Sequence, residues 1–548
     1  MKRLIFLTLA VILIFGLVLV GCKKAETTTS KPPTTTTPAV TTTPAPTDAR
    51  LPNLGSLAKP DGGKAGGRLQ LQATGNIANI GDPMVSAGPA DAAFSFLVVE
   101  PLVIVGADGN LKPWLAEEII IADDGSSITL KLRQGISFTD GTPFNADAAK
   151  YNLDTGINST MWPNMLSVQD CVIIDNYTIK LNFKDGKWDW GAAKSLASFW
   201  SVMMFSPTAL QNQTSDWKMT HVIGTGPFKL TEFVRDQKLV YDRNDDYWRG
   251  KPYLDGVDYN IIPDATVALL AYKSGQLDTI GVQAQDAEGL INDGFDIVTS
   301  TDMVFNMCLI PSSKNSDSLL ADVNIRRAVE HSINKQALVD AFTYGYGEAT
   351  NQEFCIPPYM DPTCVGYPYD IQAAKDLLTA AGHPQGIEIT LWIVDSMPMD
   401  VPTALQDMMK DANITLNVEK VSVIQFIEMI GGGGTGWDGY VYSYGFPGTT
   451  VDAASTLING PFNGNTTWIS CVQPDDLQLL SQQAAQETDS ATRTAMYQEL
   501  SRRMTDDYCM WTFMYYTPGI STVAPYLKGH TIGKYTEFFA YTFAWLDK

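Results

Sequence analysis

Three short motifs in the chain contain residue types that could carry acyl-transfer chemistry. Ser215–Lys218 and Ser332–Lys335 each place a serine three residues before a lysine, and Lys273–Gly275 is close to the K-T-G motif that accompanies such pairs in penicillin-binding enzymes. The sequence has neither the G-x-S-x-G motif of many hydrolases nor the H-E-x-x-H motif of metalloproteases. Because patterns this short arise by chance in 548 residues, the sequence does not predict an enzyme.

Metal and nucleotide chemistry are also poorly supported. The four histidines show no metal-ligand spacing, and they are His221, His331, His383 and His530. The glycine run at residues 431–436 precedes a Trp-Asp-Gly turn instead of opening a helix, so it predicts a flexible loop and not a dinucleotide site. We therefore expect no metal and no cofactor.

The N-terminus carries a clearer chemical signal. Met1–Arg3 is basic and Leu4–Val20 contains no charged residue, which is the layout of a secretory signal. The apolar run is at the short edge of a membrane-spanning helix, so a retained anchor is the alternative. Leu19–Cys22 resembles the lipobox of bacterial lipoprotein signals, which implies cleavage before Cys22 and attachment of diacylglycerol to its sulfur. We expect residues 1–21 to be the signal peptide and Cys22 the lipidated residue.

The next segment predicts a tether. Residues 22–65 consist largely of threonine, proline, alanine and glycine, and so contain too little apolar surface to offset the entropy of an ordered chain. Proline keeps such segments extended at roughly 3 Å per residue. The body of the protein should therefore hang from a lipid anchor on a disordered, Thr/Pro-rich arm.

Charge and length limit the class of protein. The 60 acidic and 38 basic side chains give a formal charge of −22, which argues against nucleic acid because phosphate binding needs a basic surface. The body after residue 65 is too long for one hydrophobic core, so two or three domains are expected. No second apolar run approaches bilayer length. These features predict a soluble, multidomain body.

Six cysteines remain besides Cys22. Cys355 and Cys364 flank the turn-rich stretch IPPYMDPT, and a disulfide between them would stabilise the fold by about 2–3 kcal/mol in the chain-entropy model. In an exported protein this pair is either a disulfide or two thiols, and the sequence leaves both open. For the other four, buried thiols are expected.

Hydrophobic periodicity changes along the body. Alternating apolar residues predict strands near residues 69–71, 128–132 and 179–183, with a helix near 145–154. Further on, helical spacing at residues 324–345 and an amphipathic helix between Asp370 and Gly382 are followed by strands at 386–394 and 414–421. This alternation predicts an α/β unit with parallel strand pairing, and a long helical segment follows at residues 475–504.

An ordered set of phrases resembles family 5 of the extracellular solute-binding proteins, the dipeptide-, oligopeptide- and nickel-type receptors of ABC importers. The phrases are Pro113–Glu117 with Leu132–Gly135, Phe138–Gly141 and Asn145–Asp147, then Ile223–Leu230, Asn244–Asp278 and Val323–Val339. Each phrase is weak by itself. Their common order over residues 66–548 makes the resemblance strong.

The resemblance implies an α/β fold of the periplasmic-binding-protein type II class, bilobed like a Venus flytrap, with an additional β-rich domain. It implies a discontinuous domain of lobe 1 at residues 66–100, 206–275 and 491–548. It places the β-rich domain of lobe 1 at 101–205 and the α/β domain of lobe 2 at 276–490. A ligand would lie between the lobes, and hinge closure would bury it.

The implied function is capture of a small solute and its delivery to the permease subunits of an ABC importer, without catalysis. The solute would be an oligopeptide, an oligosaccharide or a metal chelate, and the protein a monomer that binds no nucleic acid. The expected location is the cell envelope, with the lipid in the outer face of the cytoplasmic membrane or the protein in the periplasm. A sensor lipoprotein of the same fold that takes no part in transport is the alternative.

Ligand-binding residues are expected mainly in the stretch from Gly431 to Gly448. Peptide-binding relatives place an aspartate after the counterpart of YVYSY to pair with the peptide amine, but this chain has no carboxylate there before Asp452. Some relatives also place an arginine shortly after the LW strand, where this chain has Asp395 and Asp400. Because an unpaired buried ammonium is costly, a free peptide is disfavoured and aromatic contacts to a neutral or cationic solute gain weight. The candidates, with burial in the core as the alternative, are Trp437, Tyr442, Tyr444, Phe446, Trp392, Trp511, Asn76 and Asn79.

Overall fold

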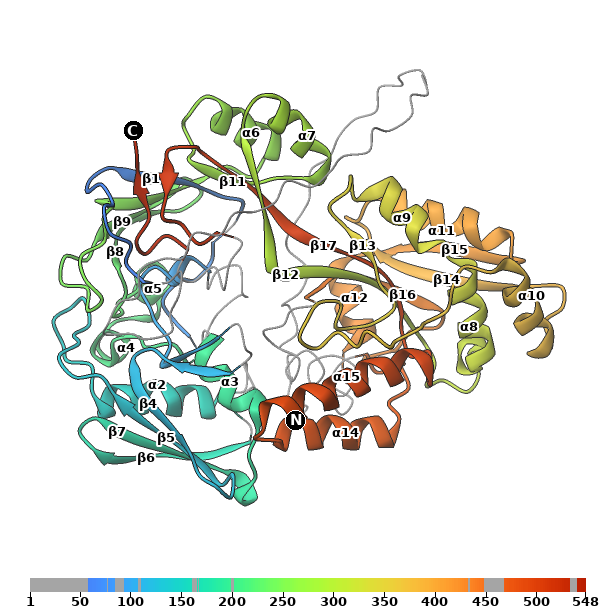
Figure 1. Cartoon of the computed structure of the whole chain (residues 1–548), viewed down its shortest axis with the longest axis horizontal. Coiled ribbons are helices and arrows are strands. Elements are labelled where there is room, and N and C mark those ends of the chain that lie inside the picture. Colours follow the sequence, from blue (N-terminus) through green and yellow to red (C-terminus); the bar gives the residue numbers. More distant parts are fainter. Residues whose placement is uncertain are drawn as a thin grey trace.

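The computed structural model describes residues 58–548 except residues 76, 84–92, 107–109, 160–164, 166, 199–201, 432–433, 448–467 and 533–539. The expected signal peptide, Cys22, most of the tether and Asn76 therefore lie outside the described residues. The ordered chain forms two lobes joined by long strands (Figure 1). This is the bilobed α/β fold with an additional β-rich domain that the resemblance implies.

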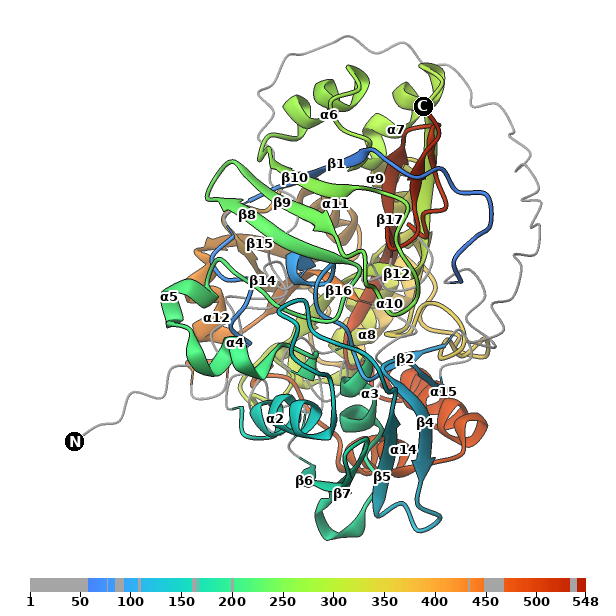
Figure 2. The same cartoon turned by 90° about the vertical axis from the view of Figure 1, so that its left-hand side faces the viewer.

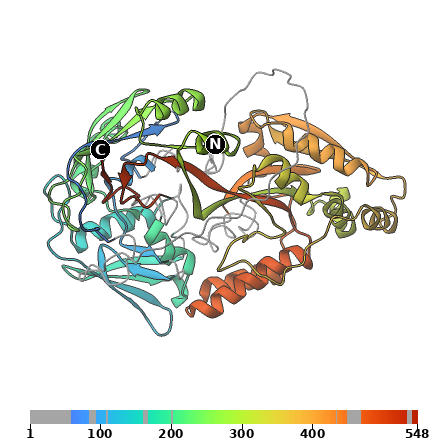
Figure 3. The ribbon, with the colours of Figure 1, turned by 45° about the horizontal axis from the view of Figure 1, so that its top comes forward.

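One sheet passes through both lobes. Its strands follow the order β15-β14-β16-β12-β17-β11-β1-β10-β9-β8, and β13 attaches to β17. β12 (Asp296–Pro311) and β17 (Thr512–Val523) pair antiparallel along most of their length and reach from one lobe to the other (Figure 3). These two strands are thus the connection about which the lobes can hinge.

Lobe 1 contains the part of that sheet formed by β1, β10, β9 and β8 (Figure 2). β1 (Arg68–Ala73) pairs parallel with β10 (Gly256–Ile261), which pairs antiparallel with β9. Leu69 and Leu71 of β1 are buried, as their alternation with polar residues predicts. The remaining elements of this part are α4 (Pro207–Asn212), α5 (Ser215–Lys218), β8 (Phe228–Val234), β9 (Lys238–Arg243), α6 (Ala265–Lys273), β11 (Thr279–Gly281), α7 (Ala284–Asn292), β18 (Leu527–Lys528) and β19 (Trp545–Leu546).

The β-rich domain of lobe 1 forms a separate sheet with the order β4-β5-β7-β6. The strands predicted at residues 128–132 and 179–183 are confirmed as β5 (Ser127–Leu132) and β7 (Thr178–Phe183), which pair antiparallel. The Asn145 side chain accepts the Ala148 backbone N–H at 3.0 Å and begins α2 (Ala146–Ile157). The other elements are β2 (Val103–Val105), β3 (Leu111–Pro113), β4 (Ala116–Ile121), β6 (Val168–Asp175) and α3 (Trp190–Ser198).

Lobe 2 is the predicted α/β unit. β14 (Ile387–Val394) pairs parallel with both β15 (Ile414–Val421) and β16 (Tyr440–Pro447), which confirms the expected parallel pairing. α10 (Ile371–Ala380) begins after Asp370, whose side chain accepts the Ala373 N–H at 2.9 Å. It ends before Gly382, whose φ of +90° belongs to the left-handed region that favours glycine. α11 (Asp400–Lys410) and α12 (Val423–Ile430) connect the strands.

The helical spacing at residues 324–345 is interrupted in the structure. α8 (Val323–Ser332) ends because Ile333 adopts an extended conformation, and the Asn334 side chain caps α9 (Lys335–Phe342). The long helical segment predicted at residues 475–504 is likewise divided into α14 (Asp475–Gln486) and α15 (Ser490–Asp506), and Asp489 caps α15. β13 (Glu348–Ala349) pairs with β17. The α14–α15 hairpin lies at the lower edge of the molecule in Figure 1, and Tyr497 of α15 packs on Phe354. The domain boundary expected at residue 490 thus falls between two helices of one hairpin.

Candidate ligand-binding site

Three of the predicted aromatic residues, Trp437, Tyr444 and Phe446, lie toward opposite ends of β16. Trp437 precedes the strand, which begins at Tyr440, and Tyr444 and Phe446 belong to its last half. At about 3.3 Å per residue, the strand places Phe446 about 20 Å from Tyr440. Phe446 pairs in register with Asn306 of β12, the strand that leads into lobe 1. The end of β16 therefore lies near the junction of the lobes, and its start lies farther out in lobe 2.

Trp392 and Trp437 line one pocket at the start of β16. Its volume is about 590 Å³, within the range of small-molecule sites. The lining residues are Asn315, Trp392, Met429, Thr435, Gly436, Trp437, Asp438 and Ser470. Both indole N–H groups are used internally, because Trp392 Nε1 donates to Asp438 O at 2.7 Å and Trp437 Nε1 donates to Ile310 O at 3.3 Å. A ligand here would meet indole faces and the exposed Asp438 carboxylate, and not indole donors.

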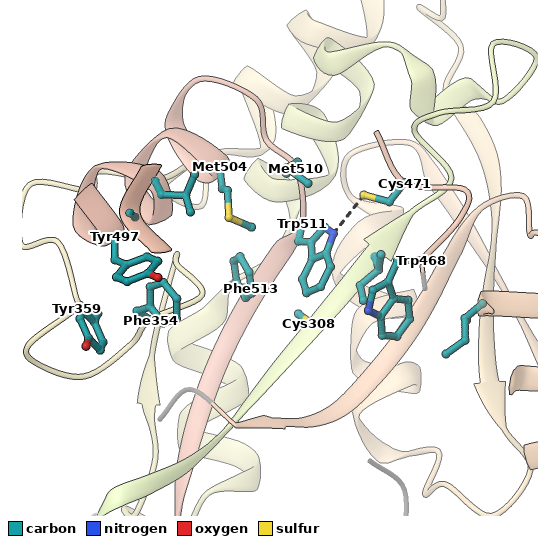
Figure 4. Packing of buried hydrophobic residues seen from close by; sticks show 14 of the residues in the cluster. Cys308, Phe354, Tyr359, Trp468, Cys471, Tyr497, Met504, Met510, Trp511 and Phe513 are labelled. Atoms are coloured by element: carbon teal, nitrogen blue, oxygen red, sulfur yellow. Dashed lines mark hydrogen bonds between the residues drawn. The ribbon is translucent and has the colours of Figure 1, made fainter. Parts of the chain in front are cut away.

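The other aromatic candidates are divided between the core and the end of β16. Tyr442 is buried. Trp511, which is 1% exposed, donates from Nε1 to Cys471 Sγ at 3.2 Å and packs edge-to-face on Trp468 (Figure 4). Trp511 is thus held in the core of lobe 2. Burial in the core was the stated alternative to ligand contact for each of these candidates. The side chains of Tyr444 and Phe446 lie outside the described part of the chain.

Asn79 closes its own loop. Its side-chain oxygen accepts the N–H groups of Gly81 and Asp82, and its Nδ2 donates to Asp82 O at 2.8 Å. With 1% of its surface exposed, the residue has a structural role in this arrangement. Asp395 and Asp400 are both exposed, so neither is buried as a clamp for a ligand.

Glu353 is a buried carboxyl group that sequence reasoning missed. It is 0% exposed, and within the described residues neither of its oxygens has a hydrogen-bond partner. Asn306 donates from Nδ2 to Gln352 O at 3.1 Å and to Glu353 O at 3.2 Å, while Asn306 Oδ1 has no partner in this part of the chain. Burial raises the pKa of Glu353 to about 8, so the group is largely protonated at neutral pH. The sequence gives no signal for it, because the flanking residues show no periodicity.

Cys355 and Cys364 are both free thiols in the structure, which is one of the two arrangements that the sequence leaves open. Cys355 is buried, whereas Cys364 is half-buried and its Sγ lies 3.7 Å from Asp506 Oδ1. The loop is held instead by other contacts. Asp506 Oδ1 also accepts the Gly366 N–H at 2.9 Å, and Gln352 exchanges two hydrogen bonds with the Asp361 backbone.

Ser332 and Lys335 are not arranged as nucleophile and base. Ser332 Oγ donates to Val329 O at 2.6 Å, and Lys335 forms a buried ion pair with Glu330 at 2.8 Å. Among the described residues no group of histidine, cysteine or acidic side chains could hold a metal ion. None of the described helices is both long and apolar enough to span a bilayer.

Known proteins resemble the chain in sequence and in fold. Residues 110–460 match the model of "Bacterial extracellular solute-binding proteins, family 5 Middle". The nickel-binding periplasmic protein of Escherichia coli K12 is 28% identical over 310 residues, which is 54% of this chain and 57% of that protein. The glutathione-binding protein GsiB of Escherichia coli O6:K15:H31 is 28% identical over 415 residues, which is 71% of this chain and 77% of that protein.

Solved structures show the same fold at lower identity. The Helicobacter pylori protein DppA in complex with the peptide STSA has a TM-score of 0.73 and 18% identity, and the match covers 88% of this chain and 99% of that one. NikA from Brucella suis in complex with Fe(III)-EDTA has a TM-score of 0.72 and 21% identity, over 86% and 99% of the two chains. The chain belongs to family 5 of the bacterial extracellular solute-binding proteins.

Proposed function

We propose that this protein is the solute-binding lipoprotein of an ABC importer, which captures a peptide-like solute or a metal chelate between its lobes and delivers it to a membrane permease. The observation that carries the proposal is the family match over residues 110–460. It is supported by the two lobes that β12 and β17 connect. Relatives named for nickel, glutathione and peptides suggest the range of solutes.

The domain division follows from the same proposal. We keep the β-rich domain at residues 101–205 and the rest of lobe 1 as a discontinuous domain. We extend the middle segment of that domain beyond residue 275 to include β11 and α7, because β11 pairs with β1 and both elements pack with α6. We move the end of lobe 2 from residue 490 to the start of β17, because α15 packs on α14 and its Tyr497 contacts Phe354 and Tyr359 of lobe 2. The monomeric state remains part of the proposal.

Stabilisation by a bound solute tests the proposed function. A ligand present at 100 times its Kd should raise the free energy of unfolding by about 2.7 kcal/mol. We expect this for one member of a panel of glutathione, the tetrapeptide STSA, nickel–histidine and chitotriose, measured as the shift in unfolding temperature from tryptophan fluorescence. A shift with chitotriose alone would move the solute class to oligosaccharides. The absence of any shift across the panel would contradict the proposed solute classes.

Lipid anchoring at Cys22 is the second part of the proposed function. Bacteria that express the chain and are fed radioactive palmitate should label the wild-type protein, and the label should be lost in Cys22→Ser. Cys364→Ser is the matched control and should remain labelled. A labelled Cys22→Ser chain would contradict the assignment.

A further inference from the structure

The two lobes touch directly at a place other than the hinge strands. α3 of the β-rich domain lies against the α14–α15 hairpin of lobe 2 (Figures 1 and 3). Buried hydrophobic side chains of the β-rich domain and of lobe 2 form one continuous cluster. Trp190 at the start of α3 and Tyr497 of α15 both belong to this cluster. The contact is therefore a dry interface and not a chance approach of two surfaces.

Arg493 of α15 lies at the centre of this interface. Its guanidinium carbon is 3.9 Å from the centre of the Trp190 ring, and the two residues are only 2% and 3% exposed. Nη1 donates to Glu487 O at 3.0 Å and to Thr488 O at 3.3 Å, the carbonyl groups of the loop that joins the hairpin. Lobe 2 thus fixes the guanidinium in place, and lobe 1 supplies the ring that covers it.

The Trp190 ring is one of several groups around the charge of Arg493, together with the two carbonyl groups of lobe 2 and the Tyr359 side chain. Among the described residues, no carboxylate forms an ion pair with the guanidinium, and burial lowers the pKa of Arg493. A buried cation without a carboxylate is stabilised by the face of an indole, which is the strongest cation–π partner among side chains. Arginine suits this position because its guanidinium is weakly hydrated and stacks on aromatic rings.

We propose that Arg493 and Trp190 form an interlobe clasp that favours the closed arrangement of the lobes and thereby raises the affinity for the solute without touching it. Because the two residues come from different lobes, their contact exists only while the lobes are together. The apparent affinity of a protein that binds in its closed state is proportional to the closed fraction. A clasp that raises the ratio of closed to open molecules tenfold can therefore tighten binding up to tenfold.

Hydrogen–deuterium exchange of the full-length chain tests the clasp without any solute. Arg493→Met retains an apolar side chain of similar length but removes the charge, and Trp190→Leu removes the ring. In each variant the amides of α3 and α15 should exchange about tenfold faster, which corresponds to about 1.4 kcal/mol. The double variant should exchange no faster than the single variants, because either change breaks the same contact.

Controls separate a clasp from general damage to the fold. Arg503 lies on the same helix but forms ion pairs with Asp476 and Asp507 of its own hairpin, so Arg503→Met should leave exchange in α3 unchanged. The sheet β4-β5-β7-β6 should stay as protected as in the wild type. Unchanged protection of α3 in Arg493→Met, or loss that spreads equally over this sheet, would overturn the clasp.

The link to affinity rests on the proposed function and is tested separately. For the solute that stabilises the wild-type chain, Arg493→Met should raise the Kd up to tenfold, and Arg503→Met should not change it. Faster exchange of α3 with an unchanged Kd would overturn the effect on affinity while the proposed function stands. If none of the panel binds the wild type, the proposed function fails, and exchange in α3 still decides whether the clasp exists.

Discussion

Replacing Glu353 with glutamine is expected to reduce the loss of stability that the protein suffers as the pH rises from about 5 to 8. Burial raises the pKa of Glu353 from 4.5 to about 8, so the folded state keeps its proton at pH values where the unfolded chain has released it. The stability associated with this proton is complete below about pH 4.5 and is lost as the pH approaches 8. Each pH unit between these values lowers the free energy of unfolding by up to about 1.4 kcal/mol.

Between pH 5 and pH 7 the glutamine variant should therefore lose about 3 kcal/mol less stability than the wild type. Glutamine has nearly the shape of protonated glutamate and does not titrate. Urea unfolding followed by tryptophan fluorescence at pH 5, 6, 7 and 8 measures both chains. Glu419→Gln, at an exposed position on β15, is the control and should follow the wild type. If the free energy of unfolding of Glu353→Gln falls with rising pH as steeply as that of the wild type, the Glu353 carboxyl group is not protonated in the fold.

Local rules predict the elements of lobe 2 well. Alternating apolar residues identify β14 and β15, and Asp370 with Gly382 marks the ends of α10, because caps and periodicity act within a few residues. The passage of β12 and β17 between the lobes is not predictable in this way. The two strands are joined by pairs such as Asn306 with Tyr516, which are distant in sequence.

The residues of the candidate site were likewise predictable only in part. Aromatic residue type alone could not distinguish Trp511, packed on Phe513 in the core, from Trp392, which lines a pocket. Burial depends on which elements cover a residue, and that information lies in the tertiary arrangement. Glu353 could not be found for the same reason, because its burial is imposed by neighbours that are distant in sequence, such as Asn306 on β12.

The same substitution at a second buried carboxyl group, Glu100, should lower the stability of the fold. Glu100 is 0% exposed, like Glu353, but four donors surround it. Trp114 Nε1 donates to Oε1 at 3.0 Å and Tyr247 OH at 2.8 Å, while Thr225 Oγ1 donates to Oε2 at 2.8 Å and Trp248 Nε1 at 2.9 Å. Both oxygens therefore accept two hydrogen bonds each.

Glutamine at residue 100 can accept at its one oxygen only, and in either orientation its NH2 group would face one hydroxyl and one indole N–H. The hydroxyl can turn to accept from the NH2 group, but the indole N–H cannot. One buried donor left without an acceptor costs about 1–3 kcal/mol, so Glu100→Gln should lower the free energy of unfolding by that amount at pH 7. The same urea titration measures it, with Glu353→Gln as the matched variant of identical chemistry. A Glu100→Gln chain as stable as the wild type would show that the four donors find other acceptors.

The location of the damage provides a further check on this prediction. Trp114 follows the β2–β3 hairpin of the β-rich domain, whereas Thr225, Tyr247 and Trp248 belong to the discontinuous part of lobe 1. Glu100 thus links the two domains of lobe 1 through hydrogen bonds on both sides. In Glu100→Gln, hydrogen exchange should increase at β2 and β3 and around residues 244–250, while β14 and β15 of lobe 2 stay protected. Faster exchange in lobe 2 alone would show that Glu100 does not stabilise the contact between the two domains of lobe 1.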